Sequence, residues 1–245
     1  MPDDQRRRDA FPTTRISLIL AARGEPGSGT RDALSVLCQS YWYPIYAYVR
    51  RLGHTQEAAE DLTQGFFACV LEKHYLAGFH RERGRFRSYL LSAMNHYIAN
   101  QRDRERAKKR GGSVTILSLE TEMGTAESRY RLEPVTDLTP NRIFERQWAL
   151  AVLARVQTRL EEEETGAGRS DRFDRLKLLL TGEDSDVGYR ALATELQTTE
   201  GAIKVAVHRL RRRFRDLLRE EISHTVESVE DVGDELRHLL SALGA

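Results

Sequence analysis

The sequence predicts an all-α protein of two small helical domains, joined by a polar linker and followed by a C-terminal helical extension. Apolar residues recur at helical spacing, and no run of alternating Val, Ile or Thr between turn signals indicates a strand. Charged residues make up 31% of the chain and aromatic residues only 8%, a balance that favours helical bundles with solvated faces. Glycine and proline interrupt the helical pattern over residues 111–140, which predicts the linker there.

The first domain is expected over residues 14–110 and contains three predicted helices. The stretch "DALSVLCQSYWYPIYAYVRRLG" has helical spacing and ends at Gly53, a typical helix stop. A second helix runs from about Gln56 to Lys73, and a third begins near "RFRSYLL" and ends in a basic run at Arg110. The second helix should bury an apolar face formed by Ala59, Leu62, Phe66, Phe67, Val70 and Leu71.

The second domain, residues 141–222, contains a helix-turn-helix pattern. A short helix over residues 189–196 is followed by the polar turn "QTTE" and by a longer helix from about Glu200. Thr198 or Thr199 can cap the longer helix by accepting a hydrogen bond from an unpaired backbone N–H. In such a motif the second helix presents its N-terminal part to the major groove of DNA. The two helices should pack together through Leu192, Leu196, Ile203, Val207 and Leu210.

Positive charge is concentrated in two segments. Residues 81–110 carry ten Lys and Arg against three acids, and residues 200–219 carry seven against two. Two basic helices in separate domains predict nucleic-acid binding that weakens steeply with salt. Aromatic and amide side chains interleave the first segment and can stack on bases or bond to base edges, although the rings can equally belong to the core. These side chains are Phe79, Phe86, Tyr89, Tyr97, Asn95 and Asn100.

Three stretches together resemble a known family. "YPIYAYVRRLG" followed by "AAEDLTQGFF" resembles region 2 of an extracytoplasmic-function (group IV) sigma factor of the bacterial sigma-70 family. "FRSYLLSAMNHYIANQRDRERAKKR" resembles the minus-10 reading helix of that family, and "YRALATELQTTEGAIKVAVHRLRRRFRDLL" resembles its region 4. The resemblance covers roughly residues 14–222, and the order and spacing of the three stretches are more specific than any one of them.

The resemblance implies a cytoplasmic, non-enzymatic subunit for transcription initiation that needs no cofactor. Its first domain would bind the clamp helices of core RNA polymerase and melt the minus-10 element of promoter DNA. The second domain would bind the polymerase flap and read the minus-35 element. No secretory signal follows the N-terminus and no stretch is long and apolar enough to span a membrane, so no membrane association is expected. Cys38 and Cys69 are expected to be buried thiols without a disulfide, as in a reducing cytoplasm.

The resemblance also assigns residues, with some departures from the family pattern. Glu60, Asp61 and Gln64 would contact core polymerase. The minus-10 DNA contacts would be Arg85, Phe86, Arg87, Tyr89, Asn95, Asn100 and Arg102, with Met94 standing where the family has arginine. The minus-35 contacts would be Thr199, Lys204, His208, Arg209, Arg211 and Arg212, of which Lys204 is the best candidate for a base contact. Val205 and Ala206 replace residues that are often polar in the family.

The stretch "AAEDLTQGFF" departs further from the family, whose helix reads close to D-A-E-D-L-V-Q-E-V-F. Acids are missing at Ala58 and Gly65, and Thr63 replaces valine. One interpretation is drift, with affinity for polymerase supplied elsewhere. The other is that the protein is inactive until a Ser/Thr protein kinase phosphorylates Thr63, because a phosphate adds about −1.5 to −2 charge. This second interpretation fits a resemblance to the sigma subgroups that are encoded beside such kinases.

The extension over residues 223–245 is acidic and has apolar residues at helical spacing, which predicts an amphipathic helix. It could pack on the second domain, compete with DNA for the adjacent basic helix, or dock a regulator. An enzyme is disfavoured because the chain lacks a phosphate-binding glycine loop, a metal-spaced ligand set and a nucleophile motif. The alternative function is a helix-turn-helix DNA-binding regulator, or a kinase-controlled adaptor, without core polymerase binding.

Overall fold

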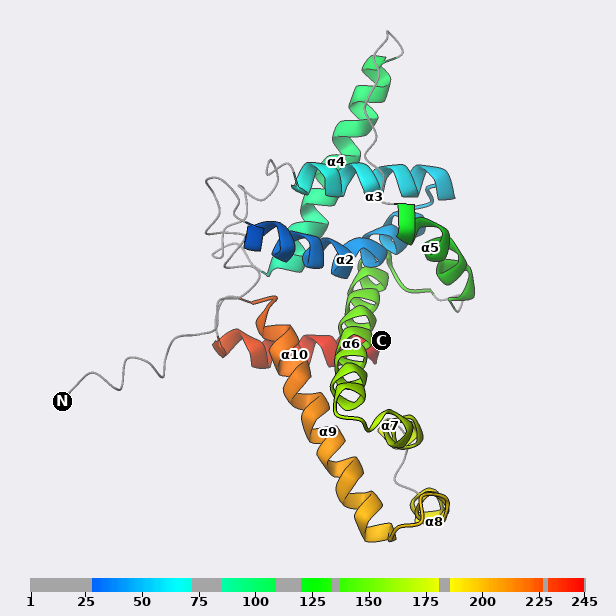
Figure 1. The fold of residues 1–245 in the computed structure, drawn as a ribbon. Coiled ribbons are helices and arrows are strands. Elements are labelled where there is room, and N and C mark those ends of the chain that lie inside the picture. Colours follow the sequence, from blue (N-terminus) through cyan, green and yellow to red (C-terminus); the bar gives the residue numbers. More distant parts are fainter. Residues whose placement is uncertain are drawn as a thin grey trace, which may run out of the picture. The chain divides into compact units, whose positions relative to one another are not determined.

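The structure is a computed structural model, and the residues that it describes are 28–71, 85–108, 120–133, 137–180, 186–226 and 229–244. Every element within these ranges is a helix (Figure 1), so the predicted all-α class is confirmed for them. Contacts divide the chain into a first unit, Met1–Ala151 with Ser223–Ala245, and a second unit, Val152–Ile222. No helix in the described ranges is long and apolar enough to cross a membrane.

The first unit contains the three predicted helices, a further helix inside the predicted linker, and the C-terminal helix. Parts of the predicted first domain and linker, such as residues 14–27, 72–84 and 111–119, lie outside the described residues. The helices of this unit are α2 (Ser28–Arg51), α3 (Gln56–Leu71), α4 (Phe86–Lys108), α5 (Glu120–Leu132), the first part of α6 (Pro140–Gly166) and α10 (Val229–Leu243).

A short turn joins α2 to α3 and is fixed by two residues. Gly53 has a φ of +91°, a left-handed value that glycine adopts without strain, and its N–H donates to the carbonyl oxygen of Arg50 at 3.0 Å. The Thr55 hydroxyl oxygen accepts a hydrogen bond from the Ala58 N–H at 3.3 Å, which satisfies a backbone donor at the start of α3. The predicted stop at Gly53 is therefore confirmed.

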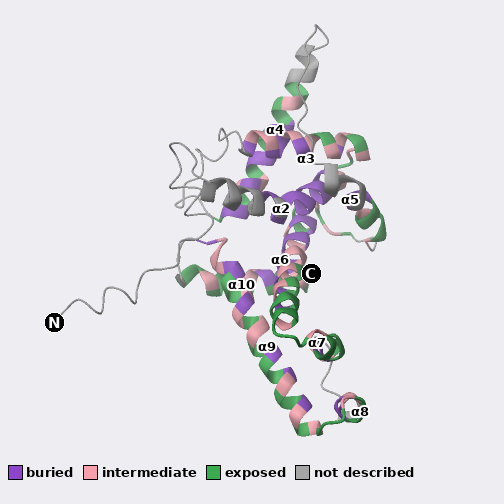
Figure 2. Cartoon of the chain, in the orientation of Figure 1, coloured by how far each residue is buried: buried purple, intermediate pink, exposed green. Residues whose placement is uncertain are grey.

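The core of the first unit is centred on α2, whose residues 41–49 are all buried (Figure 2). The ring of Tyr41 lies 5.8 Å from the ring of Phe86 in α4 and 6.4 Å from that of Phe144 in α6, measured between centroids. Such ring pairs contribute about 0.5–1.5 kcal/mol beyond the burial of their area. Aromatic packing thus attaches α4 and the start of α6 to α2. Cys38 on the same helix is buried, which raises the pKa of its thiol to about 12.

The second half of α3 has no exposed residue between Leu62 and Val70, whereas Glu57 and Asp61 in its first half are exposed. A charged side chain in this half would lose its hydration, which costs several kcal/mol unless a partner of opposite charge is supplied. The lack of charge after Asp61 therefore follows from burial of the helix.

Gly65 lies against the Tyr97 ring of α4. A Cβ atom at this position would overlap the Tyr97 hydroxyl oxygen and lie 3.4 Å from Cζ of the same ring. Tyr97 is buried, its ring is edge-on to Phe66 at a centroid distance of 5.9 Å, and its hydroxyl oxygen accepts a hydrogen bond from Gln101 at 2.6 Å. Packing therefore favours glycine at position 65, and the interpretation of this position as the site of a lost acid stays a prediction.

Replacing Gly65 with alanine should destabilise the protein, although alanine is the better helix former by about 1 kcal/mol. The overlap with the Tyr97 hydroxyl should cost about 1–3 kcal/mol, so the net change in the free energy of unfolding is a loss. In the Tyr97→Phe background the overlapping oxygen is gone, and Gly65→Ala should become neutral or stabilising. Urea unfolding of the four proteins measures this coupling.

The control for this cycle is Gly233→Ala in α10, where nothing lies within 4 Å of the added Cβ atom. This control should gain stability in both the Tyr97 and the Tyr97→Phe backgrounds. Equal effects of Gly65→Ala in the two backgrounds would contradict the packing role of Gly65.

The second unit is a helix-turn-helix supported by three further helical segments. Its predicted apolar contacts are confirmed, because Ile203, Val207 and Leu210 are buried in one core and Leu192 and Leu196 pack against it. Val156 and Leu160 of α6, with Phe173 and Leu176, complete that core. The elements are the end of α6, α7 (Ser170–Leu176), the 3-10 helix η3 (Lys177–Leu179), α8 (Asp186–Glu195) and α9 (Glu200–Ser223).

Candidate functional site

The turn between α8 and α9 is held by backbone and side-chain hydrogen bonds. Gln197 has a positive φ of 49°, and the N–H of Thr198 donates to the carbonyl oxygen of Ala193 at 2.9 Å, which closes the end of α8. The Thr199 hydroxyl oxygen accepts a hydrogen bond from the Ala202 N–H at 3.1 Å. Of the two predicted caps of α9, Thr199 is therefore the one that is used.

The outer face of α9 presents most of the residues predicted to contact minus-35 DNA. Lys204, His208, Arg209 and Arg212 are exposed, as is Thr199, although its hydroxyl group is engaged in the cap. The Lys204 ammonium group pairs with Glu200 at 2.8 Å. These residues follow one another at helical spacing, so they form a single surface.

Arg211 does not belong to that surface. It is half-buried, and its Nη2 donates a hydrogen bond to the carbonyl oxygen of Leu179 at 2.7 Å. The side chain therefore ties α9 to the end of η3, and its predicted role as a DNA contact is not supported by its orientation.

Neighbouring arginines of α9 differ in whether a carboxylate neutralises them. Arg213 donates through Nε and Nη2 to Glu163 at 2.8 and 2.7 Å and through Nη1 to Glu220 at 3.1 Å. The Arg213 hydrogen bonds hold the pKa of the Glu163 carboxyl below its usual range. Arg212, one residue earlier, has no hydrogen bond or ion pair to any described residue. The same is true of His208, Arg209 and Arg215 within the described part of the chain.

These four side chains, His208, Arg209, Arg212 and Arg215, define what we call the α9 basic stripe. Arg209 and Arg212 are three residues apart, and Arg215 follows after three more, which keeps them on one side of the helix. Helix positions are separated by about 1.5 Å along the axis, so the stripe is about 10 Å long. Cations without a carboxylate partner on a rigid helix are available to bind phosphate groups of a nucleic acid.

The α4 residues predicted to contact minus-10 DNA separate into buried and accessible groups. Phe86 and Arg87 are buried, so neither can contact DNA in this conformation, and the ring of Phe86 belongs to the core. Tyr89 is half-buried. The accessible members of the predicted set are Arg85, Asn95, Asn100 and Arg102, which are exposed, although Oδ1 of Asn95 accepts a hydrogen bond from the Tyr48 hydroxyl group at 2.7 Å.

Arg87 is buried in an ion cluster formed with α6 and α10. Its Nε pairs with Glu145 at 2.7 Å, its Nη1 pairs with Glu235, and its guanidinium carbon lies 4.9 Å from the centre of the Trp148 ring. Burial alone would lower the pKa of Arg87, but the two carboxylates raise it above its usual value, so the side chain stays charged. Glu235 also pairs with Arg85 at 3.1 Å.

The acidic extension therefore packs within the first unit through α10. The predictions were that it packs on the second domain, competes for the adjacent basic helix, or docks a regulator. Within the described residues, the buried carboxylate of Glu235 instead finds its cations at the start of α4. A buried carboxylate requires such partners, because an unpaired one would cost several kcal/mol.

The α3 residues predicted to contact polymerase are only partly accessible. Asp61 is exposed, Glu60 is half-buried and Gln64 is buried. Glu57, one turn before Asp61, is also exposed, so the outward acidic surface of α3 consists of Glu57 and Asp61. Thr63 faces inward, is 0% exposed, and its hydroxyl oxygen has no hydrogen-bond partner among the described residues.

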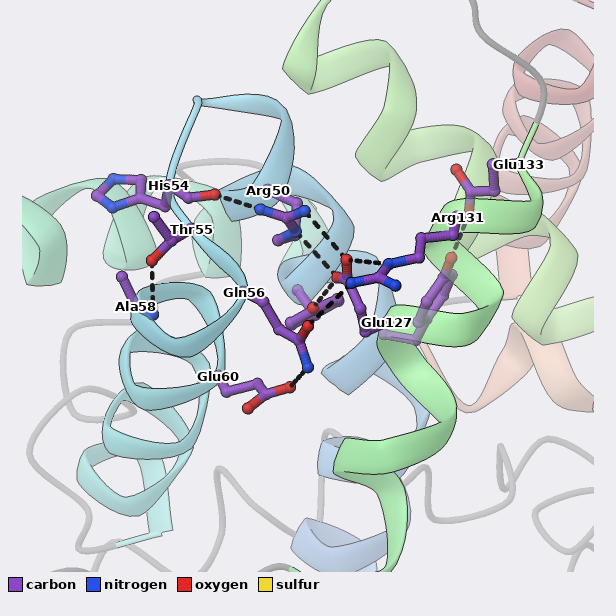
Figure 3. Close-up of polar contacts among 11 residues, drawn as sticks. Arg50, His54, Thr55, Gln56, Ala58, Glu60, Glu127, Arg131 and Glu133 are labelled. Carbon is purple, nitrogen blue, oxygen red and sulfur yellow. Dashed lines mark hydrogen bonds and ion pairs between the residues drawn. The ribbon is translucent and has the colours of Figure 1, made fainter.

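Glu127 of α5 is the centre of a polar network that holds α5 on α2 (Figure 3). Its carboxylate accepts hydrogen bonds from the Tyr46 hydroxyl group at 2.5 Å, from Arg50 through Nε and Nη2 at 3.1 Å each, and from Arg131 Nε at 3.0 Å. Burial would raise the pKa of the Glu127 carboxyl, but these hydrogen bonds together hold it below its usual value. The segment predicted as a polar linker is therefore partly a structural element of the first unit.

The same network reaches the start of α3. Arg131 Nη2 donates to the side-chain oxygen of Gln56 at 3.5 Å, and Gln56 Nε2 donates to Glu60 at 3.0 Å (Figure 3). Glu60, one of the predicted polymerase contacts, is thus occupied by a neighbour on its own helix. This series of hydrogen bonds, from Glu127 through Arg131 and Gln56 to Glu60, connects α5 to the side chains at the start of α3.

Glu127→Gln should weaken the first unit at neutral pH and remove part of its pH dependence. The folded pKa of Glu127 is depressed, so its stabilisation is present above about pH 4.3, the ordinary value, and is lost as pH falls through the lower folded value. We expect the variant to lose about 1–3 kcal/mol of unfolding free energy at pH 7. The difference from wild type should close as the pH falls below 4.

Urea unfolding at a series of pH values measures this difference, with Glu57→Gln, an exposed acid of α3, as the control that should follow wild type. A gap between wild type and Glu127→Gln that stays constant down to pH 2 would show that the ionised carboxylate is not the stabilising species.

Thr63→Val should stabilise the protein by about 1 kcal/mol, because it replaces a buried hydroxyl group without a partner by a methyl group of similar size. Thr63→Glu should destabilise it by more than 3 kcal/mol, since a carboxylate would be buried. Thermal unfolding measures both, with Thr158→Val on an exposed face of α6 as the control that should change stability by less than about 0.5 kcal/mol. An unchanged unfolding midpoint for Thr63→Glu would contradict the burial of this side chain.

Comparison of the chain with family models, with curated proteins and with solved structures finds no match.

Sequence reasoning missed three exposed residues that the structure adds to these surfaces: Glu57 on α3, Arg215 on α9 and Arg172 on α7. The helical spacing from His208 through Arg212 to Arg215 was a signal that could have identified Arg215. Arg172 belongs to a different helix and carried no such signal. It lines a hollow of about 680 Å³ together with Val205 and Arg209.

Proposed function

We propose that this chain is a DNA-binding subunit of transcription initiation, of the extracytoplasmic-function sigma type. The observation that supports DNA binding most directly is the α9 basic stripe, which lies on a capped recognition helix and has no carboxylate partners among the described residues. Cations that serve folding are paired on this helix, as Arg213 is with Glu163 and Glu220. The arginines of the stripe can bind phosphates without breaking an ion pair of the fold.

In this proposal the second unit reads duplex DNA through α9. The N-terminal turns of the helix enter the major groove, and the arginines of the stripe bind phosphates and fix the register of the helix. Binding releases counterions from the DNA, so the affinity should fall steeply with rising salt. The order of the three sigma-like sequence stretches supports the further step from DNA binding to promoter recognition.

Contact with core polymerase would use the exposed acids of α3, Glu57 and Asp61, against basic clamp helices. This surface is smaller than the family pattern suggests, since Gln64 is buried and Glu60 is engaged by Gln56. That observation favours the second candidate function, a helix-turn-helix regulator or kinase-controlled adaptor that binds duplex DNA without polymerase.

Control by a Ser/Thr protein kinase remains part of the proposal, with a physical condition attached. Thr63 is 0% exposed, so a kinase can reach its hydroxyl group only when α3 has separated from its neighbours. A phosphate carries about −1.5 to −2 charge and cannot return to an apolar site. Phosphorylation at Thr63 would therefore hold the first unit in an opened form, rather than add charge to the surface of the present one.

Arg212→Ala should weaken binding to duplex DNA and reduce the slope of log K against log salt concentration by about 0.9, the value for one lost phosphate contact. Arg213→Ala is the matched control: the same substitution one residue later, at a side chain neutralised by Glu163 and Glu220. Its salt slope should equal that of wild type. Fluorescence anisotropy with a random duplex pool at several salt concentrations gives both slopes, and equal slopes for all three proteins would contradict the role of the stripe.

The same proteins distinguish the two candidate functions when they are mixed with bacterial core RNA polymerase. A sigma factor should co-elute with the core enzyme and support initiation at specific promoters, and Asp61→Lys should weaken this co-elution while Glu162→Lys, an exposed acid on α6, should not. Duplex binding without co-elution would instead establish the regulator.

A further inference from the structure

Val205 is an exposed apolar side chain within the basic surface of α9. It is 51% exposed, although it belongs to the first two turns of the helix, and its neighbours on the same face are Lys204, His208 and Arg209. Gly201, one turn earlier, has no atom within 4 Å of the place where a Cβ would be. Gly201 and Val205 therefore form a small open and apolar area on this face, bordered by cations.

Packing does not explain this valine. The core of the second unit is formed by the opposite face of α9, through Ile203, Val207 and Leu210. Leaving a valine half-exposed forgoes part of the roughly 1.5–3 kcal/mol that full burial would contribute. Its branched side chain has one strongly preferred rotamer in a helix, so it presents its methyl groups in a fixed direction.

A hollow beside the valine leaves room for a partner group. It has a volume of about 680 Å³ and is lined by Gly201 and Val205 of α9, with Arg209 on the same helix and Arg172 on α7. Neither arginine has a hydrogen bond or ion pair to another described residue. The hollow therefore combines an apolar wall with two cations that can hold phosphate groups. Its other charged lining residues are Arg169 and Glu164, which pair with each other, and Arg213, which pairs with Glu163, so the lining keeps an excess of positive charge that is complementary to a nucleic acid.

We propose that Val205 is a specificity-determining residue that reads thymine by contact with its C5-methyl group in the major groove. This inference rests on the proposed DNA binding by α9. The thymine methyl is the apolar group that base edges display in the major groove, and apolar side chains are its usual partners. Arg209 and Arg172 would hold the flanking phosphates, so that a small apolar contact can discriminate between bases.

The test uses the full chain and a duplex enriched from a randomised pool by binding to it. Each thymine of that duplex is replaced in turn by uracil, which removes only the methyl group. Wild type should lose affinity about three- to fivefold at one or two positions, the change expected for one buried methyl group. Val205→Ala should bind the thymine and uracil duplexes equally well.

Two further variants keep the result interpretable. Arg212→Ala should weaken binding to both duplexes and leave the thymine-to-uracil ratio at the wild-type value. Val205→Thr keeps the β-branch and one methyl group, so it should retain part of the discrimination. Both positions are exposed, and the thermal unfolding midpoints of the variants should match wild type.

Each adverse outcome has a separate meaning. Duplex binding that is insensitive to uracil at every position, or discrimination that survives in Val205→Ala, would overturn the reading of thymine while leaving DNA binding intact. Unchanged DNA binding by Val205→Ala with loss of co-elution with core polymerase would assign the valine to a protein partner and overturn the inference. Absence of duplex binding at any salt concentration would overturn the proposed function itself.

Discussion

The close packing of Tyr97 on Gly65 holds α4 against α3 within the first unit. Because glycine has no Cβ, the tyrosine ring of α4 lies directly against α3. Together with the packing of α3 against α2, this contact leaves no residue from Leu62 to Val70 fully exposed. The uncharged character of this stretch follows from that burial. Thr63 is buried in the same stretch, so the packing of α3 determines which of its side chains a partner or an enzyme could reach.

Pairing with carboxylates decides which basic residues are available for function. Arg87 and Arg213 look like members of basic runs in the sequence, yet each is held by two carboxylates in the fold. Arg212 has no such partner among the described residues and can exchange water for phosphate at little cost. Net charge along a segment therefore overstates its capacity to bind nucleic acid, and the arrangement of the acids gives the more useful measure.

Local patterns predicted the helices and the helix-turn-helix core well, because periodicity and turn chemistry act within a few residues. They failed where the deciding partner is distant in the chain. The helix α5 was read as linker because its stability depends on Glu127 meeting Arg50 and Tyr46, about 80 residues earlier. The burial of Arg87 depends on Glu235, 148 residues later. The packing role of Gly65 could not be predicted either, because nothing near it in sequence shows the tyrosine that occupies its side-chain space.

The chain path of the two units also bears on how the protein is made. Val152–Ile222 is continuous, whereas the first unit is completed only by residues after Ser223, including the buried Leu239 and Ala242 of α10. Domains tend to fold as their residues leave the ribosome. The second unit can therefore form from one continuous stretch of nascent chain, whereas the buried ion pair of the first unit cannot form until Glu235, 148 residues after Arg87, has been made.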